Sequence, residues 1–182
     1  DKGYYHVNPS RNICQKCKTG TFGNIIGAVF GCQRCPKGKF GTAVAADRPA
    51  AGQNCTEGRF ADIPGANAPA ACKECSKGAF ASPPGGAARC KVCPRGWAAE
   101  EEGSSTCTAC TPGRFNPDDQ KFALNHERCT PCAETGLPVS DSAAWFCRDC
   151  PIGKVHDSSS ASSVPEEICV ECPIGWRGAS TG

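Results

Sequence analysis

The sequence repeats a short cysteine phrase along its whole length. "CQRCPKGKF" at Cys32 returns as "CKECSKGAF" at Cys72, "CKVCPRGW" at Cys90 and "CTACTPGRF" at Cys107. When the copies are aligned on the second cysteine of each pair, there are nine of them, 17 to 22 residues apart. A unit of about 19 residues cannot bury a face by itself, so the copies are expected to stack on their neighbours into an elongated rod.

The repeat also divides the chain. The full units are 17–34, 35–54 (which lacks one cysteine), 55–74, 75–92, 93–109, 110–131, 132–149 and 150–171, and partial units 1–16 and 172–182 flank them. The residue just before Asp1 is expected to be a cysteine, because Gly3 and Tyr5 match the glycine and the aromatic residue of the next unit. The sequence therefore reads as part of a longer array or as one period of a polymer.

A glycine follows the second cysteine in every unit, and an apolar side chain follows the glycine. The apolar residues are Phe22, Phe40, Phe60, Phe80, Phe115, Trp97 and Trp176, with Leu137 and Val155 in two units. The glycine predicts a turn with positive φ, and the apolar side chain is expected to cover a neighbouring cystine. The linkers between units are rich in Pro, Gly and Ala, as in "ASPPGGAAR". Short β-hairpins with little helix are therefore predicted.

The cysteines must replace a hydrophobic core. Leu, Ile, Val and Phe together are 25 of 182 residues, below the roughly 20% that a chain needs to order itself by burial. Cysteine supplies 17 residues, and a disulfide that closes a loop of about 15 residues stabilises a fold by roughly 3 kcal/mol. The sequence predicts the small disulfide-rich class and, because the cytosol keeps thiols reduced, an extracellular location.

Metal and redox chemistry are the main alternatives for these cysteines. "CQKC" followed by "CQRC" approaches a zinc-ribbon spacing, but zinc would need the units to close two by two, and the spacings do not alternate. His6, His126 and His156 stand at no ligand spacing. A thioredoxin-like site has one such motif beside a βαβ pattern, and nucleophilic catalysis needs a free thiol beside a base. We expect no enzyme activity, no metal and no cofactor.

Two disulfide schemes fit the repeat, and sequence alone does not decide between them. A crossed scheme would join Cys14 to Cys32 and Cys17 to Cys35. The favoured, sequential scheme joins the second cysteine of each pair to the first of the next: Cys17–Cys32, Cys55–Cys72, Cys75–Cys90, Cys93–Cys107, Cys110–Cys129, Cys132–Cys147 and Cys150–Cys169. It leaves Cys14, Cys35 and Cys172 unpaired or bonded between units, Cys35 because Gly52 stands where its partner belongs.

Some residues outside the repeat pattern are candidates for modification or binding. Asn54 in "NCT" is a candidate N-glycosylation site, and the serine run offers candidate O-glycosylation sites at Ser158, Ser159, Ser160, Ser162 and Ser163. A ligand-binding face is expected to expose off-pattern aromatic residues, and the candidates are Tyr4, Phe30, Phe122, Trp145 and Phe146. The formal charge is +2 and the chain has no long apolar run. Nucleic acid and membrane are therefore not expected partners of this segment.

The phrases "CPKGKF", "CPRGW", "CTPGRF", "CPIGKV" and "CPIGWR" resemble the ephrin-receptor-like and growth-factor-receptor cysteine-rich repeats. They are more distantly similar to tumour-necrosis-factor-receptor modules, within the broad range of small EGF-like units. The resemblance covers essentially the whole chain and implies an extracellular stalk, as in the long surface and flagellar-hair proteins of algae and protists.

Two functions compete. The first is a structural rod in a cell-surface or flagellar filament, and the alternative is a ligand-binding or adhesion ectodomain of a receptor. For the first, Cys14 and Cys172 are expected to seek partners in further copies, by head-to-tail self-association or by continuation of a longer chain. Glycans are the other expected partner.

Overall fold

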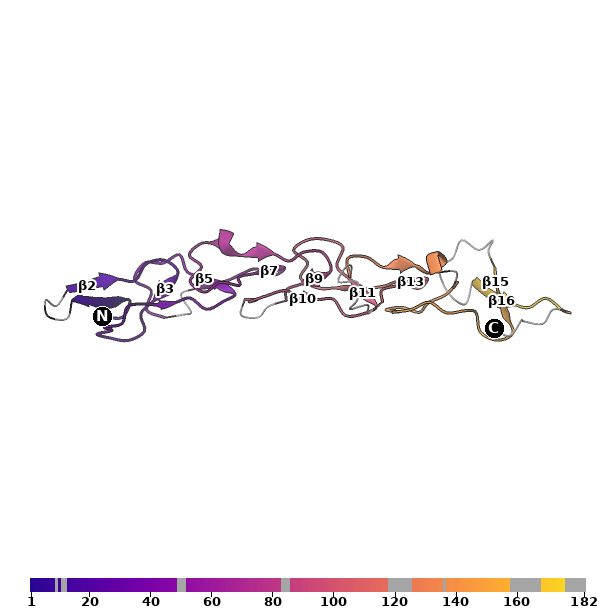
Figure 1. Cartoon of the computed structure of the whole chain (residues 1–182), viewed down its shortest axis with the longest axis horizontal. Helices are drawn as coiled ribbons and strands as arrows, with labels where there is room; N and C mark the ends of the chain where they lie inside the picture. Colours follow the sequence, from indigo (N-terminus) through magenta and orange to yellow (C-terminus); the bar gives the residue numbers. More distant parts are fainter. Residues whose placement is uncertain are drawn as a thin grey trace. The chain divides into compact units, whose positions relative to one another are not determined.

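The computed structural model describes residues 1–8, 10, 13–48, 52–82, 86–117, 126–135, 137–157 and 168–175. Within them the secondary structure consists of two-stranded β-hairpins and the short 3-10 helices η3 (Pro69–Ala71) and η4 (Cys132–Thr135). The strand pairs are β1 (Tyr4–Asn8) with β2 (Ile13–Lys16), β3 (Thr21–Phe22) with β4 (Gln33–Arg34), β5 (Lys39–Phe40) with β6 (Gln53–Asn54), β7 (Arg59–Phe60) with β8 (Lys73–Glu74), β9 (Ala79–Phe80) with β10 (Lys91–Val92), β11 (Trp97–Ala98) with β12 (Thr108–Ala109), β13 (Arg114–Phe115) with β14 (Thr130–Pro131) and β15 (Lys154–His156) with β16 (Cys169–Glu171). Figure 1 traces these hairpins in chain order. The predicted small disulfide-rich fold with little helix is confirmed.

Each hairpin is built from the cysteine and glycine of the repeat. In the repeat 17–34, Gly20 takes a φ of +78°, and its carbonyl accepts a hydrogen bond from the N–H of Cys35 at 2.8 Å. The same bond, from the next second cysteine to the glycine, recurs from Cys17 to Gly3 and from Cys55 to Gly38. A glycine has no Cβ to resist this left-handed turn, which lets the chain reverse directly into a two-residue strand.

Successive repeats are joined by backbone hydrogen bonds. The N–H of Gly20 donates to the carbonyl of Gly41 at 2.7 Å, and the N–H of Gly23 donates to Ala46 at 2.8 Å. Phe22 thereby forms a parallel bridge with Ala46, and the bridges Tyr5 to Ala28, Phe40 to Ala66 and Phe60 to Ala87 repeat it. We call this recurring set of bonds the stacking ladder. It satisfies backbone groups that a lone hairpin would leave to water.

The chain divides into two compact units. Unit 1 comprises residues 1–76, 80–91 and 102–106, and unit 2 comprises 77–79, 92–101 and 107–182. In unit 1 a buried cluster holds Phe40, Ala61 and the cystine sulfurs of Cys55 and Cys72. In unit 2 one cluster joins Ala98 to Cys110 and Cys129, and another joins Val139, Ile168 and Cys169. Small cores of cystine and short apolar side chains thus replace one central core in each unit.

The burial of the apolar side chain after the glycine varies more between repeats than the sequence pattern suggests. Phe22 and Phe40 are buried, at 5% and 6% exposure. Phe60, Phe80 and Phe115 are half-buried, and Trp97 is 38% exposed. Trp97 stands one place earlier in the repeat, and because side chains alternate between faces along a strand, that shift turns it outward. The expected cover over the cystine is therefore wrong for Trp97, whereas Trp176 lies outside the described residues.

Candidate functional site

The cystines join the second cysteine of each pair to the first of the next, as in the sequential scheme. Each of the seven closes a loop with a sequence separation of 14 to 19 residues and holds its two Cα atoms 5.5 to 5.8 Å apart. The pairs are Cys17–Cys32, Cys55–Cys72, Cys75–Cys90, Cys93–Cys107, Cys110–Cys129, Cys132–Cys147 and Cys150–Cys169. Every loop therefore lies within one repeat, and no disulfide crosses from one repeat to another.

The geometry of the sulfurs bears on the zinc alternative. Fourteen cysteines are bonded to each other, and a sulfur in a disulfide is no longer the thiolate that zinc requires. Across the described part of the chain, no three His, Cys, Asp or Glu residues gather closely enough to hold a metal ion. The ring of His6 lies 3.9 Å from the Sγ of Cys14, which is a single thiol–imidazole contact on an exposed surface.

Three cysteines have free thiols, and they differ in exposure. Cys14 is exposed, Cys172 is intermediate, and Cys35 is buried at 3% exposure. Burial raises the pKa of the Cys35 thiol, against the opposing effects of a backbone hydrogen bond and of Lys39. Because the thiolate is the reactive form, Cys35 is expected to react more slowly than Cys14.

The register of the β5–β6 hairpin shows why Cys35 is unpaired. Phe40 pairs with Gln53 just as Phe60 pairs with Lys73 in the next repeat. Gly52 therefore precedes β6 where the disulfide-bonded Cys72 precedes β8. The repeat 35–54 keeps its hairpin without a cystine, because the strand pairing and the stacking ladder remain in place.

We expect Gly52→Cys to form an eighth disulfide with Cys35. The new loop would have the same sequence separation, 17 residues, as Cys55–Cys72, and a loop of this length is worth about 3 kcal/mol. The expected result is a loss of two mass units from the oxidised protein, no labelling of Cys35 by iodoacetamide after denaturation, and slower amide exchange in β5 and β6. Gly52→Ser is the matched control, since it adds a side chain of similar size without a sulfur. A free Cys35 in oxidised, folded Gly52→Cys would contradict the prediction.

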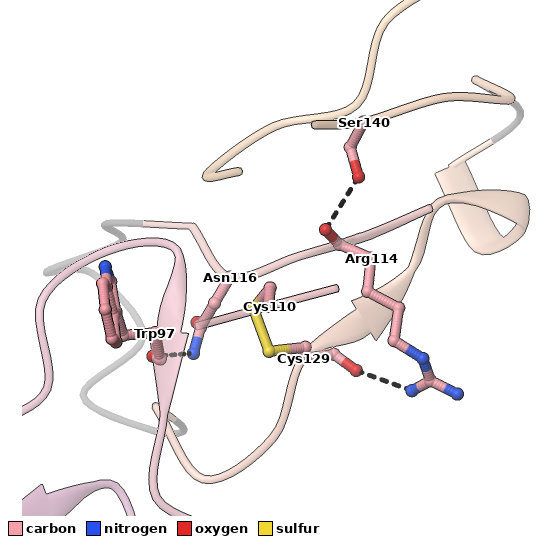
Figure 2. The surroundings of a disulfide bond; sticks show 6 residues. All are labelled: Trp97, Cys110, Arg114, Asn116, Cys129 and Ser140. Atoms are coloured by element: carbon pink, nitrogen blue, oxygen red, sulfur yellow. Dashed lines mark hydrogen bonds between the residues drawn. A yellow bond between two sulfur atoms is a disulfide. The ribbon is translucent and has the colours of Figure 1, made fainter. Parts of the chain in front are cut away.

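Two buried polar side chains reinforce the stacking ladder in unit 2. Asn116 is 2% exposed, and its Nδ2 donates to the carbonyl of Trp97 at 2.9 Å. Ser140 is 1% exposed, and its Oγ donates to the carbonyl of Arg114 at 2.8 Å. Figure 2 shows both bonds on either side of the Cys110–Cys129 disulfide. Each side chain reaches the preceding repeat, so the two bonds connect three consecutive repeats.

Neither of these two residues was predicted from the sequence to have a role. Asn116 occupies a repeat position that holds a small apolar residue in the five preceding full repeats, namely Gly23, Gly41, Ala61, Ala81 and Ala99. That departure from the repeat was the available signal. A buried amide needs hydrogen-bond partners, and the neighbouring repeat supplies them to Asn116.

The off-pattern aromatic residues have different surroundings. Trp145 and Phe146 are about half exposed and stack edge to face, with ring centroids 4.7 Å apart. The Arg95 guanidinium lies 4.6 Å from the centroid of the Trp145 ring, at cation–π distance. Phe30 is 99% exposed, Tyr4 is half-buried in β1, and Phe122 lies outside the described residues. Among the described candidates, Trp145 and Phe146 are therefore in contact with each other.

Of the candidate glycosylation sites, Asn54 lies among the residues that the structure describes. Asn54 lies exposed in β6, and its Oδ1 accepts a hydrogen bond from the ammonium of Lys39. A glycan on the Asn54 amide nitrogen would point to solvent. The serine candidates, Ser158, Ser159, Ser160, Ser162 and Ser163, lie outside the described residues.

No protein-family model and no curated protein matches the sequence. Among the residues that the structure describes, no helix has the length and apolar character of a membrane span.

Proposed function

We propose that this chain is an extracellular structural protein whose cysteine repeats form part of a cell-surface or flagellar stalk or filament. The observation that carries the proposal is the stacking ladder, in which successive repeats, seven of them with a disulfide of their own, are bonded to each other through their backbones. An array of this kind can be extended by adding repeats, because each repeat offers to the following repeat the same backbone hydrogen-bonding groups that the preceding repeat offered to it. Seven disulfides are typical of proteins that mature in an oxidising compartment.

A spacer role is consistent with where the stabilising bonds lie. The disulfides close loops of 14 to 19 residues within single repeats, so tension along the array cannot unravel those loops while the cystines are intact. The interfaces between repeats are made of backbone bonds, as from Gly38 to Ala61 at 2.9 Å and from Gly58 to Ala81 at 2.8 Å. Such bonds tolerate variation in side chains, which is what a repetitive structural protein requires.

The alternative is a receptor or adhesion ectodomain, and one loop favours it. Ile25, Ile26, Val29 and Phe30 lie within six residues of each other and are all at least half exposed. Exposed apolar clusters of this kind often mark protein-binding surfaces. In this alternative the loop 25–30 binds a protein ligand and the other repeats hold it away from the cell.

Immunogold electron microscopy of intact, unpermeabilised cells that produce the protein separates the two functions. Antibodies against the full chain are expected to decorate filaments or stalks at regular intervals outside the cell. Permeabilised cells and pre-immune serum serve as controls. Gold that lies only inside the cell would contradict the proposal, and gold dispersed over the surface as isolated particles would favour the receptor.

A further inference from the structure

The small net charge of the chain conceals two oppositely charged halves. The boundary of the repeats at residues 92 and 93 separates them. Residues 1–92, the cationic half, contain 13 Lys and Arg against 5 Asp and Glu, a formal charge of +8. Residues 93–182, the anionic half, contain 7 Lys and Arg against 13 Asp and Glu, a formal charge of −6. The two values add up to the net charge of +2.

The excess charges of the cationic half face solvent and lack partners. Exposed basic residues with no ion pair among the described residues are Lys2, Lys16, Lys18, Arg34, Lys37, Lys77, Arg89 and Lys91. Three of the five acidic residues in this half, Asp47, Asp62 and Glu74, are already bound to Arg48, Lys73 and Arg59. The positive charge is therefore not neutralised locally.

The anionic half has the converse surface. Glu100, Glu102, Glu134, Asp149 and Glu171 are exposed and form no ion pair in the described ranges. Asp141 pairs with Arg148 at 2.9 Å, an ion pair that leaves the excess of the half unchanged.

The two signs occur at equivalent positions of the repeat. The residue just before the second cysteine is Lys16 in "CQKC" and Arg34 in "CQRC", whereas it is Asp149 in "CRDC" and Glu171 in "CVEC". The same position of the cationic half also holds one acidic residue, Glu74 in "CKEC", which is paired with Arg59. All five are exposed, so packing of the repeat does not dictate their charge. The repeat fold is the same with either sign, so the fold does not account for the excess of one sign in each half.

We propose that the cationic half of one copy binds the anionic half of another copy. This inference deepens the proposed filament role by naming the surfaces through which copies associate. Contact between like halves of two copies would place charges of the same sign together, whereas contact between the cationic half of one copy and the anionic half of another places +8 against −6. A polyanionic partner such as a sulfated glycan would match the cationic half and leave the acidic half without a role. A second copy matches both.

The interaction is made of exposed charges, so salt must weaken it. Each exposed ion pair contributes at most about 1 kcal/mol, and several acting together are needed for stable association. The Debye length is about 10 Å at 0.1 M salt and about 3 Å at 1 M, so such pairs are screened at high salt. The binding is expected to be orientation-specific, reversible and sensitive to ionic strength.

Sedimentation velocity of the oxidised full chain tests the proposal. The Cys14→Ser background prevents covalent dimers through the exposed thiol. Self-association that grows with protein concentration is expected at about 20 mM salt, with an association constant at least roughly tenfold weaker at about 500 mM. A monomer at low salt, or association that salt does not change, would overturn the proposal. So would a concentration-independent compaction at low salt, which means that the halves bind within one chain.

Charge-reversal variants supply the decisive comparison. Glu100→Lys with Glu102→Lys and Glu134→Lys brings the anionic half from −6 to zero. Lys16→Glu with Arg34→Glu and Lys37→Glu brings the cationic half from +8 to +2. Each triple variant alone is expected to lose self-association, while their mixture forms a one-to-one complex, because one retains its cationic half and the other its anionic half. Self-association of the first variant, or no complex in the mixture, would overturn the proposal.

A matched control tests whether reversing exposed charges abolishes self-association even when the net charge of the half is unchanged. Lys18→Glu with Glu57→Lys exchanges two exposed charges within the cationic half and leaves it at +8. This double variant is expected to associate as the parent does.

Heparin, as a soluble sulfated glycan, tests the other partner: binding of heparin by a chain that stays monomeric at low salt would assign the cationic half to glycans. Surface labelling of filaments in the absence of any salt-sensitive association would leave the proposed function standing and this inference refuted.

Discussion

Reduction of the seven disulfides is expected to unfold the chain, whereas EDTA is expected to leave it folded. Each cystine closes a loop of 14 to 19 residues. A loop of this length contributes about 3 kcal/mol through the unfolded state. Even half of the total from the seven disulfides would match the 5 to 15 kcal/mol by which whole domains are stable. The buried clusters hold few large apolar side chains, Phe40 and Ile168 among them, and cannot replace the lost cross-links.

The measurement is amide dispersion in two-dimensional NMR, together with the Stokes radius from gel filtration. Treatment with a phosphine reductant followed by iodoacetamide is expected to collapse the dispersion and enlarge the radius, and iodoacetamide alone is the control. Retained dispersion after complete reduction would show that burial and the stacking ladder suffice. Loss of structure with EDTA and no reductant would restore a metal-based scaffold.

The repeat predicted local structure well because its signals are local. A glycine three residues after a cysteine needs only its own backbone freedom to turn, and it does so at Gly20 with a φ of +78°. Gly52 in place of a cysteine identified the odd thiol, Cys35, within the sequential scheme. These features depend on spacing along the chain, which the sequence displays directly.

Features that depend on contacts with the next repeat could not be predicted from the spacing of the cysteines. Ala45 and Ala143 take left-handed φ values of 58° and 55°, a conformation usually left to glycine, because their N–H groups bind the carbonyls of Cys17 and Cys110. Asn116 is buried because Trp97 offers it a carbonyl. Hydrogen bonds between repeats decide these positions, and the sequence shows them only as departures from the pattern.

The turn glycines also contact the repeat after next, and this contact leaves no room for a side chain at Gly58. Gly58 has a φ of +73°, and a Cβ built on it would lie 1.7 Å from the carbonyl oxygen of Gly103. Gly27 has nearly the same φ, +72°, but a Cβ there would meet nothing within 4 Å. The two glycines therefore separate the cost of backbone conformation from the cost of lost space.

We expect Gly58→Ala to open the stacking ladder locally and Gly27→Ala to be tolerated. Both variants carry the penalty of a left-handed alanine, roughly 1 to 2 kcal/mol. Gly58→Ala must also displace a backbone carbonyl, and such overpacking adds about 1 to 3 kcal/mol. Rigid backbone on both sides leaves no flexible side chain to move aside.

Native-state amide exchange of the oxidised chain reads this difference residue by residue. The N–H of Cys75 donates to Gly58 at 2.9 Å, and the N–H of Gly103 donates to Cys75 at 2.7 Å. A loss of about 3 kcal/mol corresponds to exchange about 100-fold faster at these two amides, while Gly27→Ala is expected to leave them unchanged. The N–H of Cys17, which bonds to Gly3, serves as the internal reference in both proteins. Equal exchange of Cys75 and Gly103 in the two variants would mean that the contact between Gly58 and Gly103 yields without cost, and that the ladder is held by adjacent repeats alone.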